Sequence, residues 1–201
     1  NLDRIGQVNA FHDGFTITGD GLTAGSGGLL TGVNQGALIN AAQDVSLALL
    51  DVRSTVAGVA VQAVGTSQPE NLTLARLTLD GGTAAGWVGL DVAWSNGAHF
   101  GDPNVFSGNT ILGAGASQIG MRLQNTQSNP EMLATLSGNV INLTGASSDG
   151  ILLTAQGFGA GQVANFGGIQ LSGTQNNLIT VPGNPFVATE LDGATIDGSI
   201  L

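Results

Sequence analysis

The chain has 201 residues, of which 33 are glycine and 9% are charged, and its formal net charge is −10 at pH 7. The absence of cysteine excludes a disulfide scaffold and a thiolate metal site. The four basic residues, all arginine, are too few for a nucleic-acid interface, and no apolar run is long enough to span a membrane. We therefore expect a single domain over residues 1–201 that neither binds nucleic acid nor inserts into a membrane.

Five segments led by a glycine recur at spacings of 30, 31, 31 and 30 residues: Gly28, Gly58, Gly89, Gly120 and Gly150. After each glycine, apolar residues alternate with small or polar ones, which is the periodicity of a β-strand. The first and third residues after the glycine are expected to face a core: Val59 and Val61, Leu90 and Val92, Met121 and Leu123, Ile151 and Leu153. The residue between them is expected to point outward: Ala60, Asp91, Arg122 and Leu152.

A second set of strand-like segments follows about twenty residues after each glycine. Its members are Val45–Leu49, Leu74–Leu79, Ser107–Leu112, Ser137–Leu143 and Asn177–Thr180. The stretch Ala41–Val52 also suits a helix by length, but Val45, Leu47 and Leu49 alternate as in a strand. We therefore interpret it as strand.

A period of about thirty residues with several short strands predicts one turn of a parallel β-helix per repeat. The fold class is therefore all-β, a parallel β-helix (solenoid) of about six to seven coils, right-handed by the usual crossover rule. The coils are predicted to start near the five glycines. Residues 1–27 would form a first partial coil or cap, and residues 181–201 the last coil or cap.

Residues at equal positions in successive coils are expected to stack as structural ladders. Gly58, Gly89, Gly120 and Gly150 form one such column. Asp91 and Arg122 would face each other on adjacent coils as an exposed ion pair worth about 0–1 kcal/mol. Asn109 and Asn139 also lie at equal positions in consecutive coils. There asparagine tolerates a left-handed turn, and its amide can bond to the next asparagine.

Irregular segments follow the glycine-led strand in each coil: Gln62–Glu70, Ser95–Asn104, Thr126–Met132 and Gln156–Asn165. Insertions at one coil position are expected on one face of a solenoid, which is often the binding face, although loop variation there also costs little stability. The binding candidates at or in these segments are Trp94, His99, Phe100, Asp102 and Phe158.

The segments Asp13–Gly19, Ser107–Ile111 and Ser137–Ile141 resemble the short repeats of right-handed parallel β-helix proteins. The stretch Leu77–Gly86 is similar in texture to passenger domains of bacterial autotransporters of the pertactin type. The resemblance implies a secreted or cell-surface protein that binds a host or neighbouring cell-surface protein or glycan. That superfamily includes adhesins, phage tailspikes and polysaccharide lyases or hydrolases, so the resemblance is specific for the fold and not for the function.

Catalytic chemistry has little support in the sequence. Asp51 and Asp80 come close to alignment as an acidic pair, but no lysine accompanies them, and the usual signatures of polysaccharide hydrolases of this fold are absent. His12 and His99 lack a third ligand at matching spacing, so they are interpreted as solvated loop residues. We predict no catalytic residues, no metal site and no cofactor.

Three functions follow from this reading. The first is a non-catalytic stalk or adhesin whose variable loops bind a partner. The second is a polysaccharide-acting lyase or hydrolase. The third is a phage-tail or filament assembly module, for which we expect homo-oligomers formed by end or side stacking, because the end of a β-helix is an unpaired edge.

Overall fold

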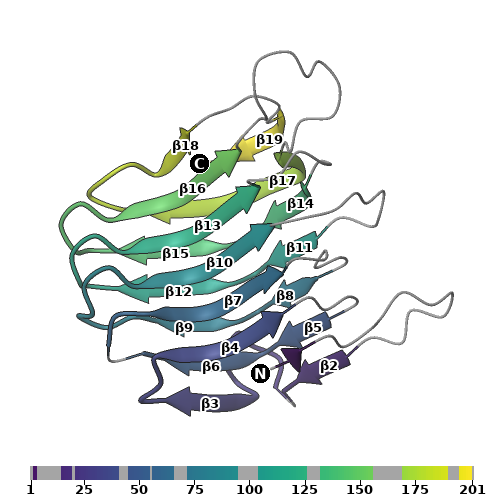
Figure 1. Cartoon of the computed structure of the whole chain (residues 1–201), viewed down its shortest axis with the longest axis vertical. Helices are drawn as coiled ribbons and strands as arrows, with labels where there is room; N and C mark the ends of the chain where they lie inside the picture. Colours follow the sequence, from purple (N-terminus) through teal and green to yellow (C-terminus); the bar gives the residue numbers. More distant parts are fainter. Residues whose placement is uncertain are drawn as a thin grey trace, which may run out of the picture.

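The computed structural model describes residues 2–3, 15–19, 21–40, 45–54, 56–65, 72–94, 104–125, 132–155, 169–189 and 195–200. In these residues the chain forms strands β1 to β19 and no helix. The strands wind into a parallel β-solenoid whose turns stack one upon another along a single axis (Figure 1). The all-β class and the solenoid fold are therefore confirmed.

Three sets of parallel strands, sheets A, B and C, run along the solenoid, and each regular turn contributes one strand to each of them. Near the C-terminus sheets B and C join into one 12-stranded sheet. Sheet A contains β1 (Leu2–Asp3), β4 (Gln35–Asn40), β7 (Val59–Gly65), β10 (Val88–Trp94), β13 (Ile119–Asn125), β16 (Asp149–Ala155) and β18 (Phe186–Thr189). Sheet B contains β2 (Phe15–Thr18), β5 (Val45–Ala48), β8 (Thr73–Ala75), β11 (Asn104–Ser107), β14 (Met132–Ser137), β17 (Ile169–Thr180) and β19 (Thr195–Ile200). Sheet C contains β3 (Gly28–Thr31), β6 (Leu50–Arg53), β9 (Thr78–Asp80), β12 (Thr110–Gly113) and β15 (Val140–Leu143).

The regular part of the solenoid extends from β5 to β16 and makes about four turns, fewer than the six to seven predicted. Shorter or irregular strands continue the same sheets at both ends. Towards the C-terminus, the long strand β17 pairs with both β14 and β15, and its register shifts against β14 and β19. The predicted number of coils assumes one repeat length for the whole chain, whereas the rungs at the ends depart from it.

The core is built from columns of apolar side chains, one residue from each rung. One column of sheet B consists of Leu47, Leu74, Phe106 and Leu136, all of them 1% exposed or less. The corresponding column of sheet C consists of Val52, Leu79, Ile111 and Ile141. Burying each such side chain contributes about 1.5–3 kcal/mol, which is why strand alternation was a reliable signal for these positions.

Glycine is required in sheet A where its backbone packs on the isoleucine side chains of sheet C. A Cβ at Gly120 would lie 2.6 Å from Ile141 Cγ2, and one at Gly89 would lie 2.8 Å from Ile111 Cγ2. The next rung's backbone carbonyl would also be too close, at 2.6 Å and 2.5 Å respectively. Register places Gly89, Gly120 and Gly150 in one column.

Two of the five glycines lie elsewhere, which corrects the predicted column. Gly28 belongs to sheet C, where it pairs with Leu50. Gly58 precedes the pair Val59–Val88 and so is level with Trp87. Ala60 and, one rung earlier, Gly36 occupy the column instead.

The displacement of Gly58 has a simple cause. Arg53 is level with Asp80, and Val59 is level with Val88, so the turn before β7 is two residues shorter than the turn before β10. Strand alternation is unchanged by a shift of two residues, and the sequence pattern therefore did not reveal it. In β7 the residues level with core residues Leu90 and Val92 are Val61 and Ala63, and the outward residue between them is Gln62, not Ala60.

The corner between sheets C and A is filled by one large side chain per rung, which comes from the sheet A side in two rungs and from the sheet C side in the third. Trp87 packs on Gly81, since a Cβ there would lie 2.4 Å from the indole ring. In the next rung the Gln118 amide packs on Gly113 and donates to Ala84 O at 2.8 Å. In the rung after that, Leu143 fills the corner beside the small Ser148. The constraint is therefore on the summed volume of the corner rather than on either position alone.

Candidate functional site

Four of the five predicted binding residues lie outside the described part of the chain: His99, Phe100, Asp102 and Phe158. The fifth, Trp94, is the last residue of β10, where its backbone pairs with Gly65 and Asn125 in the adjacent strands. The predicted variable segments also begin or end inside strands. Gln62 lies in the middle of β7, and Asn104 and Met132 are the first residues of β11 and β14.

The described strands set the points at which these variable segments leave and rejoin the solenoid. The ends of β7, β10, β13 and β16 are level with one another, and so are the starts of β8 and β11 within one residue. Each variable segment connects a sheet A strand to the next sheet B strand. The attachment points therefore follow one edge of the solenoid, between sheets A and B.

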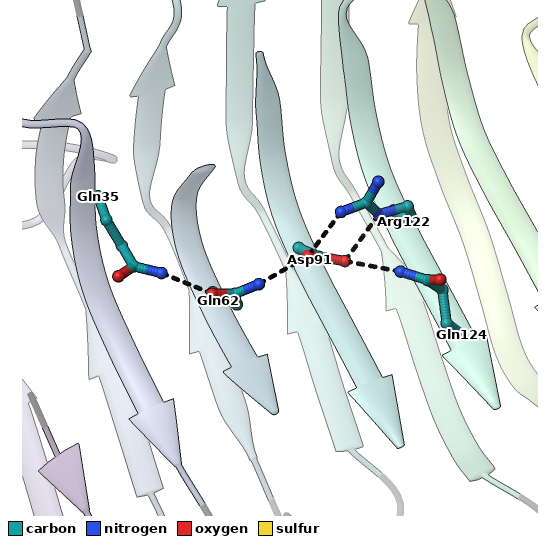
Figure 2. A network of polar contacts seen from close by, with 5 residues as sticks. All are labelled: Gln35, Gln62, Asp91, Arg122 and Gln124. Atoms are coloured by element: carbon teal, nitrogen blue, oxygen red, sulfur yellow. Dashed lines mark hydrogen bonds and ion pairs between the residues drawn. The ribbon is translucent and has the colours of Figure 1, made fainter. Parts of the chain in front are cut away.

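A chain of polar side chains crosses four rungs on the outer face of sheet A (Figure 2). Gln35 Nε2 donates to Gln62 Oε1 at 2.6 Å, and Gln62 Nε2 donates to Asp91 Oδ2 at 3.0 Å. Arg122 binds the same carboxylate with two bonds, Nε to Oδ1 at 2.8 Å and Nη2 to Oδ2 at 2.7 Å. Gln124 Nε2 donates to Asp91 Oδ1 at 3.1 Å. Asp91 thus accepts four hydrogen bonds from two neighbouring rungs.

Asp91 and Arg122 face each other in register, but the site differs from the exposed ion pair that was expected. The Asp91 side chain is only 2% exposed, and that of Arg122 is 30% exposed. The hydrogen bond from Arg122 to Asp91 raises the pKa of the guanidinium, which therefore stays charged at any ordinary pH. Removing one partner of a buried pair costs more than breaking a surface pair, because the remaining charge is left with fewer partners. The three glutamines escaped the sequence reasoning, although the alternation of β7 and β13 points to Gln62 and Gln124.

The predicted acidic pair, Asp51 with Asp80, does not form in register. Asp51 is level with Thr78, and Asp80 is level with Arg53. Arg53 binds Asp51 through Nη2 at 2.7 Å and Nε at 3.0 Å, and its pKa is raised by that hydrogen bond and by the charge of Asp51. Asp80 accepts a bond from Gly82 N at 2.8 Å. The Arg53 guanidinium therefore lies level with Asp80 and is held in an ion pair with Asp51, so the two carboxylates do not form an isolated acidic pair.

Asp51 is buried because another segment passes over it. The turn between β2 and β3 approaches sheet C from outside, and Gly25 N donates to Arg76 O at 3.1 Å. A Cβ at Gly25 would lie 3.4 Å from Asp51 Cβ and 2.5 Å from Thr78 Oγ1. Glycine at this position lets the turn contact the sheet. The burial of Asp51, one of the two carboxylates considered for catalysis, therefore has a structural explanation.

An asparagine ladder runs inside the corner between sheets B and C. Asn109 Nδ2 donates to Asn139 Oδ1 at 2.9 Å, and Asn139 Nδ2 donates to Asn177 Oδ1 at 2.8 Å. Asn109 and Asn139 are fully buried and Asn177 is 3% exposed. Each Oδ1 also accepts a backbone N–H from the preceding rung, which in the first case is that of Leu77. The left-handed positions belong to Gly108 and Gly138, at φ 61° in both, and not to the asparagines as expected.

No group of three or more histidine, cysteine, aspartate or glutamate residues in the described ranges is placed to hold a metal ion. The same residues contain no helix long and apolar enough to cross a membrane. The described polar side chains thus form ladders that connect successive rungs. The fold defines the chain as a parallel β-solenoid protein. Comparison of the chain with protein-family models, curated proteins and solved structures found no match.

Proposed function

We propose that the chain is a non-catalytic segment of a secreted or surface-displayed bacterial β-helix protein of the autotransporter-passenger type. It would serve as a stalk that presents its variable segments to a cell-surface protein or glycan. The observation that carries the proposal is the network of Gln35, Gln62, Asp91, Arg122 and Gln124, which bonds four rungs to one another. Polar groups used in this way stiffen an elongated rod and are not free for chemistry on a substrate.

The other acidic side chains support the same proposal. The carboxylates of Asp51, Asp80 and Asp149 each accept a hydrogen bond from within the solenoid, from Arg53, Gly82 N and Asn184 N respectively. A glycosidase needs two carboxyl groups that face a common substrate. The carboxylates of Asp51, Asp80 and Asp149 instead bond to groups of the solenoid itself.

The arrangement of the variable segments supports the adhesive part of the proposal. Their attachment points follow one edge of the rod, so several segments can contact one extended partner. Trp94 ends the strand that leads into the segment 95–103, which contains His99, Phe100 and Asp102. Aromatic and amide side chains are suited to stacking on sugars or contacting a protein surface.

The test replaces residues 95–103 by a Gly-Ser linker of equal length and measures binding to a glycan array and to bacterial and host cells. Asn104 is kept, because its Oδ1 accepts the Leu72 N–H at 3.0 Å. The matched control replaces in the same way residues 126–131, the variable segment between β13 and β14, which contains none of the predicted binding residues. We expect the first replacement to lower binding at least tenfold and the control to lower it less, with both proteins retaining the wild-type circular dichroism spectrum.

Two results would overturn this proposal. One is a wild-type chain that binds no glycan and no cell surface in these assays. The other is release of new reducing ends or unsaturated sugars from a polysaccharide, with loss of that activity in Asp51→Asn or Asp80→Asn. The second result would establish the polysaccharide-acting alternative instead.

A further inference from the structure

Two polar atoms inside the corner between sheets C and A have no hydrogen-bond partner among the residues that the structure describes. They are the indole nitrogen of Trp87, Nε1, and the side-chain amide oxygen of Gln118, Oε1. Both residues are 0% exposed. Folded proteins rarely leave buried polar groups unpaired, and an internal water is the usual partner where no protein group is in reach.

The two residues occupy neighbouring positions of one column. Val88 pairs with Ile119 in the adjacent strand. Trp87 and Gln118 each come one position earlier, so they are level in consecutive rungs, and Ile119 N donates to Trp87 O at 2.9 Å. The two unpaired atoms therefore lie in the same corner and on adjacent rungs of the solenoid.

The chemistry of the two atoms is complementary. The indole N–H of Trp87 can only donate, and the amide oxygen of Gln118 can only accept. The orientation of this amide is fixed, because Nε2 donates to Ala84 O at 2.8 Å and to Gly82 O at 3.3 Å. A flipped amide would place Oε1 against these two carbonyl oxygens. The corner thus offers one donor and one acceptor to a molecule that can do both.

The next rung provides a measure of the space in this corner, because its turn has the same backbone. The turns 113–118 and 143–148 have equal length between level strands. Their left-handed residues are at equivalent positions, with φ 55° at Ser117 and 57° at Ser147. Side chains that fill the two corners can therefore be compared directly.

The corner that contains Gln118 holds fewer side-chain atoms than the corner of the next rung. There Leu143 and Ser148, both buried, supply six non-hydrogen side-chain atoms. In the rung of Gln118 the amide side chain supplies five, and Gly113 supplies none. Since protein interiors are packed at nearly constant density, the same backbone leaves room in this rung for about one more atom.

We propose that this corner binds one internal water molecule, which accepts the Trp87 Nε1–H and donates to Gln118 Oε1. Water has one non-hydrogen atom and both donates and accepts, which is what the space and the two partners require. Both partners are neutral, so nothing in the corner would balance the charge of a buried ion. The inference concerns the interior of the solenoid and is independent of the function proposed above.

Nuclear magnetic resonance on the ¹⁵N-labelled chain detects such a water directly. The chain has two tryptophans, Trp87 and Trp94, and Trp94→Phe assigns their indole N–H signals. A long-lived internal water gives laboratory-frame and rotating-frame Overhauser peaks of opposite sign to the indole proton of Trp87, whereas proton exchange with solvent gives peaks of the same sign. We expect peaks of opposite sign for the wild-type chain.

The sharpest variant transfers the side chains of the next rung into this one, as Gly113→Leu combined with Gln118→Ser. This change fills the corner with the same six atoms and removes the amide oxygen. The new hydroxyl can bond to Ala84 O in the way that Ser148 Oγ donates to Gly115 O at 3.2 Å. We expect the Overhauser peaks from water to Trp87 to be lost while the circular dichroism spectrum is retained.

The control variant Asn142→Leu changes an exposed side chain on β15 and should keep the water peaks. A wild-type chain whose Trp87 indole proton shows no peak from water, or exchange peaks only, would overturn the inference. Retention of the water peaks in the double variant would do the same. If the double variant does not fold, Gln118→Leu decides, because a water left with one polar partner is not held and its peaks should disappear.

Discussion

The corner between sheets B and C has one backbone geometry along the rod but two different chemistries. In every regular rung a residue with positive φ makes the turn: Leu49 at 64°, Arg76 at 53°, and Gly108 and Gly138 at 61°. In the two upstream rungs that residue carries a side chain and is followed by a leucine. In the two downstream rungs it is glycine and is followed by a buried asparagine.

The upstream and downstream rungs stabilise the same corner in two different ways. The upstream rungs fill it with apolar volume from Leu50 and Leu77 and accept a left-handed backbone at a residue other than glycine, which costs about 1–2 kcal/mol. The downstream rungs avoid that cost and bond the corner with side-chain amides. Asn109 joins the two systems, because its Oδ1 accepts the N–H of Leu77.

Breaking the downstream ladder should have the largest effect. Asn139→Leu removes the acceptor of the Asn109 N–H and the donor to Phe106 C=O, and each lost partner costs about 1–3 kcal/mol, so we expect unfolding to require about 4 kcal/mol less free energy. Urea denaturation followed by circular dichroism measures the change. Asn142→Leu, on the exposed face of β15, is the matched control and should stay within about 0.5 kcal/mol of wild type. A loss below 1 kcal/mol for Asn139→Leu would show that leucine can fill the corner of the downstream rungs as well as that of the upstream rungs.

The upstream corner should respond to loss of volume. Leu77 is fully buried, and Leu77→Ala is expected to cost about 3 kcal/mol through lost burial and the cavity left behind. Leu77→Asn should cost less, because the new amide can donate to Asn109 Oδ1 and extend the ladder by one rung. The same denaturation assay compares the two variants. Equal losses would mean that the ladder cannot be extended upstream.

The downstream glycines should tolerate alanine poorly for a purely conformational reason. A Cβ at Gly138 would have its nearest neighbour at 3.9 Å, so no clash arises. Gly138→Ala is nevertheless expected to lose about 1–2 kcal/mol, because φ stays positive. Thermal unfolding with Ser137→Ala as control measures the cost. An unchanged midpoint would indicate that the turn relaxes to another conformation.

The smallest expected effect is a gain. Arg76→Gly relieves a left-handed arginine but adds chain entropy to the unfolded state, so the net stabilisation is expected to be about 0.5 kcal/mol. Arg76→Ala is the informative control, since it removes the side chain and keeps the backbone cost. If both variants change stability equally, the arginine side chain and not its φ angle is responsible.

The regular rungs were largely predictable because their signals are local and repeated. Alternation identified the strands around Leu90 and Met121, and equal spacing identified the pairs Asp91–Arg122 and Asn109–Asn139. The burial of Asp91 was not predictable, since it depends on Gln62 and Gln124 from the neighbouring rungs. Likewise, nothing near Asp51 in the sequence indicates that the turn containing Gly25 covers it.

By itself the sequence determined the class of fold, the parallel stacking and the columns of the central rungs, because burial of alternate apolar residues repeats with the same period as the chain. Only the tertiary structure decided the register of the early rungs, where Gly28 and Gly58 lie outside the column that contains Gly89. A two-residue difference in turn length preserves the alternation of every strand, so the choice is made by contacts between sheets. At Gly89 the decisive contact is with Ile111, a residue that follows it by more than twenty positions and reaches it only when the rung has closed.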